Sequence, residues 1–100
     1  MAAATVAFNG VVVKKLRDRN YGNWSVLVKN YLMGQGLWDV VSDFATKSED
    51  EDWKKKNVKA LHAIQLSCGS RAFGLIHKCV TAQDAWNQLR FSFSSYSGVD

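Results

Sequence analysis

Apolar residues that recur at helical spacing are the feature that most constrains this fold. From Asn23 onward, large side chains return every three or four positions and therefore fall on one face of a helix. The 100 residues include no proline, the usual breaker of helices, so glycine and polar turns must make the connections. The sequence predicts an all-α fold, a compact bundle of about five helices with short connections. The expected helices cover residues 23–33, 37–44, 48–68, 70–79 and 81–93.

The N-terminal segment has a different pattern. Residues 4–8 and 11–14 are apolar and rich in valine, and they flank Asn9 and Gly10, a dipeptide that favours the positive φ angles of a type I′ turn. This pattern predicts a short β-hairpin. The alternative is a loosely docked arm, because an isolated two-stranded hairpin is only marginally stable. Three parts are expected: an N-terminal arm or hairpin at 1–19, a helical domain at 20–95 and a tail at 96–100.

The composition of the chain and the position of its first basic residues fit one small domain in the cytoplasm. Apolar residues make up 47% of the chain and charged residues 22%, close to the ordinary globular mix. No stretch approaches the ~20 apolar residues that a membrane span needs. The first basic residues, Lys14 and Lys15, follow the apolar start, which is the wrong order for a secretory signal. We expect a cytoplasmic location and no membrane partner.

His62, Cys68, His77 and Cys79 are the residue types that zinc sites and thiol nucleophiles use. Structural zinc sites pair Cys-x₂₋₄-Cys with His-x₃₋₅-His, and neither spacing occurs here. No orienting partner or strained turn marks a cysteine–histidine nucleophile. We therefore expect no metal, no cofactor, no small-molecule substrate and no enzymatic activity. The cysteines are expected to be reduced thiols rather than a disulfide.

Four consecutive acidic residues, 49–52, open the third expected helix. Ser48 and Glu51 have the spacing of a capping box, and negative charge is favourable at the positive end of the helix dipole. A calcium loop would need oxygen ligands spread over about twelve residues around a central glycine, which this run lacks. We interpret the run as a solvated helix start.

Lys14, Lys15, Arg17 and Arg19 form a basic cluster opposed only by Asp18. These four side chains are the candidates for phosphate or RNA contacts, and the net charge of +4 permits such a partner without requiring one. No aromatic-rich binding strand or zinc knuckle accompanies the cluster. Two interpretations stay open, with plain solubility preferred over weak RNA binding.

Three motifs, in order, resemble the opening of Gag polyproteins of copia-type retrotransposons. Residues 20–24 read Asn-Tyr-Gly-Asn-Trp and residues 37–41 read Leu-Trp-Asp-Val-Val, where the family shows Asn-Tyr-x-x-Trp, a helix and Leu-Trp-x-x-Val. Trp53 and residues 60–64 match the next part, and residues 81–89 match a Thr-Ala-x-x-Ala-Trp-x-x-Leu helix. The motif residues expected in the core are Tyr21, Trp24, Leu37, Trp38, Trp53, Leu61, Ile64, Ala82, Ala85, Trp86 and Leu89.

The resemblance covers residues 16–93, looks like the plant group of the family and implies a capsid-like helical domain. In that family, Gag assembles into a shell that packages the RNA of the element. The second half of the capsid region and the Cys-x₂-Cys-x₄-His-x₄-Cys knuckle that grips RNA are not in these 100 residues. We expect a non-enzymatic Gag-like capsid domain that acts by self-association or by binding another protein. The alternatives are a domesticated plant adaptor domain, such as one fused to ankyrin repeats, and a weak RNA-binding module.

Overall fold

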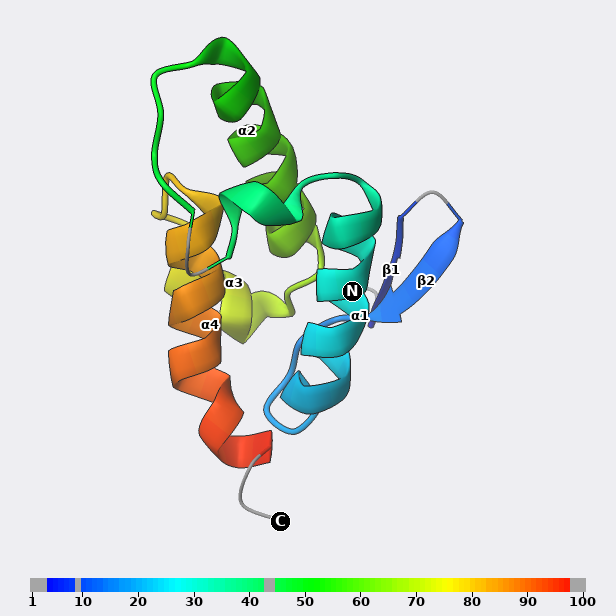
Figure 1. Cartoon of the computed structure of the whole chain (residues 1–100). Coiled ribbons are helices and arrows are strands. Elements are labelled where there is room, and N and C mark those ends of the chain that lie inside the picture. Colours follow the sequence, from blue (N-terminus) through cyan, green and yellow to red (C-terminus); the bar gives the residue numbers. More distant parts are fainter. Residues whose placement is uncertain (1–3, 9, 43–44, 98–100) are drawn as a thin grey trace.

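A computed structural model describes residues 4–8, 10–42 and 45–97 of the chain. Helices make up most of this part, so the predicted helical class is confirmed. In Figure 1, α1 and α4 lie side by side, and the hairpin stands on the outer side of α1. The elements are β1 (Thr5–Phe8), β2 (Val11–Lys14), α1 (Tyr21–Gly34), η1 (Trp38–Val40), α2 (Glu51–Leu66), α3 (Ser70–Ile76) and α4 (Ala82–Ser97).

Within the described residues, the structure has four α-helices and not the predicted five. The segment expected as the second helix, 37–44, contains only the single 3₁₀ turn η1. The backbone N–H groups of Val40 and Val41 donate to the carbonyl oxygens of Leu37 and Trp38, three residues back, which is the 3₁₀ pattern and not the α-helical one. Packing holds the turn, because Val40 and Val41 are 1% and 0% exposed. Phe44, which the sequence placed at the end of this helix, lies outside the described residues.

The N-terminal hairpin is confirmed, and it is docked rather than loose. β1 and β2 pair antiparallel, with Phe8 opposite Val11. Gly10 has a φ of +87°, in the left-handed region that favours glycine, whereas Asn9 lies outside the described residues. Phe8 stacks on Tyr31 of α1, with the two ring centroids 4.6 Å apart. This contact supplies the packing that an isolated hairpin lacks.

Tryptophan rings join the helices at the centre of the core. Trp24 of α1 stacks on Trp86 of α4, with ring centroids 5.4 Å apart. Trp38 of η1 meets the same Trp86 ring edge-on at 5.3 Å. Both geometries are ones that aromatic pairs prefer, and they bring three separate elements together.

A short parallel bridge ties the segment before α1 to the end of α2. The backbone N–H of Leu16 donates to the carbonyl oxygen of Ser67 over 2.8 Å, and the N–H of Gly69 donates to the carbonyl oxygen of Leu16 over 3.0 Å. Leu16 and Cys68 lie opposite each other in this bridge. A Cβ atom on residue 69 would stand 2.8 Å from the Leu16 oxygen, so this close approach requires glycine. The bridge fixes the basic segment against the start of α3.

Two amide side chains fix the loops around the start of α4. Asn57, on the otherwise apolar inner face of α2, donates to the carbonyl oxygen of Val80 over 2.9 Å and accepts from the N–H of Ala82 over 2.8 Å. Gln83 donates to the carbonyl oxygen of Ser42 over 2.9 Å. These bonds satisfy backbone groups that would otherwise be costly to bury.

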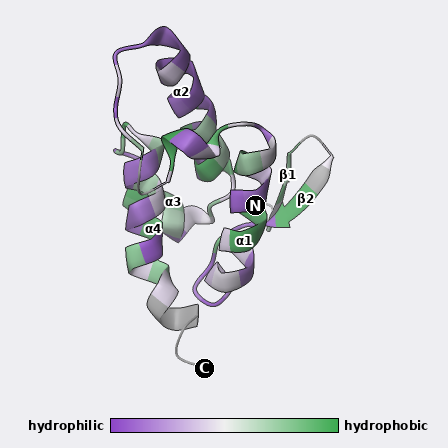
Figure 2. Cartoon of the chain, in the orientation of Figure 1, coloured by the Kyte–Doolittle hydropathy of each residue, from purple (hydrophilic) through white to green (hydrophobic). Residues whose placement is uncertain are grey.

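α2 begins with a different cap from the predicted one. Its N-cap is Asp50, whose side chain accepts from the N–H of Asp52 over 3.4 Å. Ser48 accepts from the N–H of Asp50 over 3.0 Å, so the predicted Ser48–Glu51 capping box is wrong. The acidic run offers several oxygen acceptors in a row, and spacing alone does not decide between them. The hydrophilic start of α2 is visible in Figure 2.

Candidate functional site

The predicted basic cluster lines one open groove. Lys14, Lys15, Arg17 and Arg19 all border a hollow of about 970 Å³ between the segment before α1 and the start of α3. Three of these side chains are exposed, and Lys15 is half-buried. The fold therefore brings the candidate phosphate contacts together, although phosphate binding itself stays a prediction.

Asn20 shapes the loop that carries these cations. Its side-chain oxygen accepts from the N–H of Arg17 over 2.7 Å, and its side-chain nitrogen donates to the carbonyl oxygen of Lys15 over 2.9 Å. Leu16, between them, is 1% exposed and belongs to the bridge with α2. The loop thus buries its one apolar residue and turns its basic neighbours toward solvent.

Sequence reasoning missed a fifth cation in the groove. Arg71 on α3 lines the same hollow and forms an ion pair with Asp18. Its guanidinium carbon lies 5.2 Å from the centroid of the Phe93 ring, a cation–π contact. Phe73, also on α3, lines the groove and is 42% exposed. No local signal in the sequence could have joined α3 to the basic cluster, because 53 residues separate Arg71 from Asp18 and the two segments meet only through the tertiary fold.

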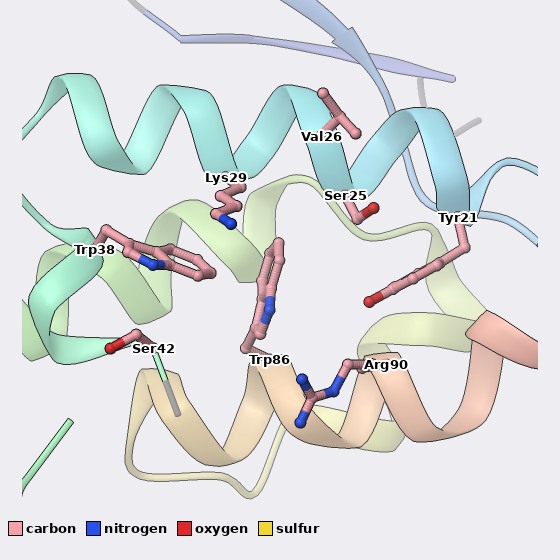
Figure 3. Close-up of a pocket in the computed structure, with 8 residues that line it drawn as sticks. All are labelled: Tyr21, Ser25, Val26, Lys29, Trp38, Ser42, Trp86 and Arg90. Atoms are coloured by element: carbon pink, nitrogen blue, oxygen red, sulfur yellow. The ribbon is translucent and has the colours of Figure 1, made fainter. Parts of the chain in front are cut away.

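A second, smaller cleft lies between α1 and α4. It has a volume of about 340 Å³, and Figure 3 shows the side chains around it. Trp86 stands in its middle, with Trp38 on one side and Tyr21 on the other, while Lys29 reaches in from α1 and Arg90 from α4. Ser25, Val26 and Ser42 complete the lining.

Aromatic rings and positive charges meet in this cleft. The Lys29 ammonium lies 5.0 Å from the centroid of the Trp38 ring. Arg90 donates to the side-chain oxygen of Asn87 over 3.0 Å, which helps to orient its guanidinium. Burial raises the pKa of Tyr21 above its ordinary value of 10.0, and the positive charge of Arg90 opposes part of that rise. No acidic side chain is among the described residues that line the cleft.

The motif residues of the copia-type resemblance divide into two groups. Most of them are buried, among them Trp24, Ile64 and Leu89 at 1% exposure or less. Trp38, Trp53 and Leu61 are only partly buried and pack against the core from its edge. The partly buried Trp38 therefore belongs to the wall of the cleft as well as to the core.

The titratable residues do not gather into a metal site within the part of the chain that the structure describes. Cys68 is a buried free thiol, and burial raises its pKa from the ordinary 9.0 to about 12. Cys79 is a half-buried free thiol whose pKa is raised by burial and by the negative charge of Asp84. A raised pKa keeps both sulfurs protonated and weakly nucleophilic at neutral pH. Among the described helices, none combines the length and apolar character required to cross a membrane.

The fold and these two surfaces define a small helical domain whose charged and aromatic groups line open clefts. The family described as gag-polypeptide of LTR copia-type matches residues 28–99. The chain therefore belongs to the copia-type Gag polypeptides, as the motifs around Trp38, Trp53 and Trp86 predicted. No curated protein and no solved structure matches the chain significantly.

Proposed function

We propose that this chain is a non-enzymatic Gag-type domain that acts by self-association, with the exposed apolar residues of α1, Val26, Leu27 and Met33, in contact with a second copy. Membership of the copia-type Gag family supports a role in protein assembly. The observation that carries the proposal is the composition of α1. Of its 14 residues, only Lys29 is charged, whereas the 16 residues of α2 include six charged ones.

The apolar residues of α1 are not confined to its inner face. Trp24 and Val28 point into the core, yet Val26, Leu27 and Met33 are 57%, 50% and 53% exposed. A helix at the surface of a monomeric domain normally carries charged residues on its outer side, and a group of exposed apolar residues often marks a contact with another protein. A second copy is an occupant that needs no further protein, and paired identical surfaces are the commonest form of oligomer.

Mass photometry and light scattering over a range of concentrations test this proposal. We expect the mass of the wild type to rise with concentration, and we expect a Val26→Glu/Met33→Glu variant to stay monomeric. Val58→Glu is the control, because Val58 is also an exposed valine, 64% exposed, and lies on α2 and not on α1. A wild type that stays monomeric at high concentration would contradict self-association and favour the alternative, a domesticated adaptor that binds a different protein.

A second candidate function is weak binding of RNA in the basic groove. The convergence of Lys14, Lys15, Arg17, Arg19 and the additional Arg71 around one hollow favours it. Single-stranded nucleic acid needs a positive groove together with an aromatic ring for stacking, and the half-exposed Phe73 lies at this groove. The proposal is therefore that phosphates contact the lysines and arginines while a base lies on Phe73.

A salt titration of oligouridylate binding tests the RNA candidate. We expect the logarithm of the affinity to fall with the logarithm of salt concentration, with a slope of about −0.7 per phosphate contact. Lys14→Glu/Arg17→Glu should abolish binding, whereas the matched control Lys55→Glu/Lys59→Glu, on exposed positions of α2, should leave it nearly unchanged. Absence of binding at low salt, or an equal loss in both variants, would remove this candidate.

A further inference from the structure

We propose that the guanidinium of Arg71 is a phosphate-binding subsite of the basic groove, and that the carboxylate of Asp18 occupies this subsite until a phosphate of single-stranded RNA displaces it. Asp18 is then an internal competitor of the ligand, because both are oxygen anions that pair with the same guanidinium. This inference rests on the RNA binding proposed above as the second candidate function. It adds the position of one phosphate and the group that limits the affinity of the groove.

The ion pair between Asp18 and Arg71 marks where an anionic oxygen is bound in the groove. Nη1 of Arg71 donates to Oδ1 of Asp18, although 53 residues separate the two. Both residues line the groove, and Asp18 is the one acidic side chain among its described lining residues. Carboxylates and phosphates both match the planar fork of a guanidinium, so one can replace the other. A phosphate oxygen can therefore take the place of the Asp18 carboxylate oxygen.

Arg71 differs from the other cations of the groove in having an acidic partner. Within the part of the chain that the structure describes, the basic residues in ion pairs are Lys54, Lys56 and Arg71. The remaining cations of the groove have no acidic partner among those residues; they are Lys14, Lys15, Arg17 and Arg19. A bound RNA strand would therefore meet four unpaired cations and one, Arg71, whose charge Asp18 already neutralises.

The ion pair is exposed enough to open. The side chains of Arg71 and Asp18 are 59% and 60% exposed. An ion pair between groups this exposed contributes little stability and is weakened further by salt. Asp18 lies in the turn that precedes α1, so a change of its side-chain rotamer is enough to move the carboxylate into solvent. Displacement of Asp18 by a phosphate therefore requires no change in the backbone.

Arg71 keeps its place when the pair opens, because a second contact holds it. Its guanidinium carbon lies 5.2 Å from the centroid of the Phe93 ring, and Phe93 is 0% exposed in the core. The attraction of a guanidinium to the face of a ring does not depend on an acid. The subsite is therefore already in position for a phosphate, and the release of Asp18 is what weakens binding.

A double-mutant cycle of oligouridylate binding tests the displacement of Asp18. Its four proteins are the wild type, Asp18→Asn, Arg71→Gln and the double variant, measured by fluorescence polarisation at low salt. We expect Asp18→Asn to bind about two- to fivefold more tightly than the wild type, the range that corresponds to an exposed ion pair. In the Arg71→Gln background the same change should give a smaller gain, because no pair has to be broken there.

Glu49→Gln is the matched control for the change of charge. The side chain of Glu49 is 87% exposed and pairs with Lys54, and Glu49 does not line the groove. This variant should bind oligouridylate with nearly the affinity of the wild type. Asp18→Asn and Glu49→Gln should both melt close to the wild type, because each removes one exposed charge.

Two results would overturn this inference and leave RNA binding standing. An equal or larger gain in the Arg71→Gln background would show that Asp18 only repels RNA and does not compete for Arg71. Weaker binding by Asp18→Asn would show that the carboxylate orients Arg71 for the ligand. If neither the wild type nor Asp18→Asn binds oligouridylate at low salt, the RNA candidate and this inference both fail.

Discussion

The ring N–H of Trp24 donates to the carbonyl oxygen of Ser67 over 2.9 Å, although 43 residues separate the two. The same oxygen accepts from the backbone N–H of Leu16 over 2.8 Å. One carbonyl group at the end of α2 therefore holds both the first helix and the basic segment that precedes it. Because Leu16 lines the basic groove, this carbonyl group connects the side chain of Trp24 with the backbone that positions the groove.

Replacing Trp24 should separate its packing from its hydrogen bond. Trp24→Ala is expected to lower the free energy of unfolding by about 3–5 kcal/mol, because the side chain is 1% exposed and leaves a cavity. Trp24→Phe keeps one aromatic ring but removes the hydrogen bond, worth about 1 kcal/mol, and the packing of the second ring, so its cost should lie between about 1 kcal/mol and that of Trp24→Ala. Urea denaturation measures both. A Trp24→Ala protein that kept the midpoint of the wild type would show that this ring is not in the core.

Gly69 and Gly74 should respond in opposite ways to alanine. A Cβ at residue 69 would stand 2.8 Å from the Leu16 carbonyl oxygen, so Gly69→Ala must displace backbone and is expected to cost about 1–3 kcal/mol. A Cβ at Gly74 in α3 meets nothing within 4 Å, so Gly74→Ala should stabilise the helix by about 0.5–1 kcal/mol. Thermal melts of the two variants check the difference. Equal effects would mean that the Leu16 bridge does not form.

The side chain of Asn57 should contribute to the stability of the fold through its two hydrogen bonds. Asn57→Leu keeps the size of the side chain but leaves the Val80 oxygen and the Ala82 N–H without this partner, at a cost of about 1–3 kcal/mol. Gln88→Leu is the control, because Gln88 is an exposed amide on α4 and its replacement should change stability by less than about 0.5 kcal/mol. Urea denaturation of Asn57→Leu and Gln88→Leu measures the difference. An equal loss of stability in the two variants would show that the hydrogen bonds of Asn57 do not stabilise the fold.

The buried thiol of Cys68 should make stability fall in alkaline solution. Burial raises its pKa from 9.0 to about 12, so between these values the unfolded chain loses the thiol proton while the folded chain keeps it. The free energy of unfolding should therefore fall as the pH rises above 9.0. Cys68→Ala removes this contribution, and the gap in stability between wild type and variant should narrow with rising pH. A gap that stays constant across that range would show that Cys68 is open to water.

The helical class, the hairpin as one of two open interpretations and the family were predictable because their signals are local, whereas the docking of the hairpin depends on the contact of Phe8 with the distant Tyr31. Trp24, Val28 and Leu32 repeat at the spacing of one helix face, and the alanine and tryptophan of residues 81–89 do the same. The segment at 37–44 misled the prediction, because its apolar residues fit a helix but are held in a single turn by the core. The spacing of apolar residues indicates which side of a segment is buried. In a short segment it does not distinguish the hydrogen bonds of a 3₁₀ turn from those of an α-helix.

The sequence by itself determined the helices and their inner faces, because one turn of helix places residues three and four positions apart on the same side. Only the tertiary structure decided which side chains line the basic groove and the cleft between α1 and α4. Arg71 joins Lys14 and Arg17 because Leu16 pairs with the end of α2, and Lys29 and Arg90 line one cleft because α1 packs against α4, where Trp24 stacks on Trp86. Contacts between residues so far apart in the chain depend on how whole elements pack, and no local pattern encodes that arrangement.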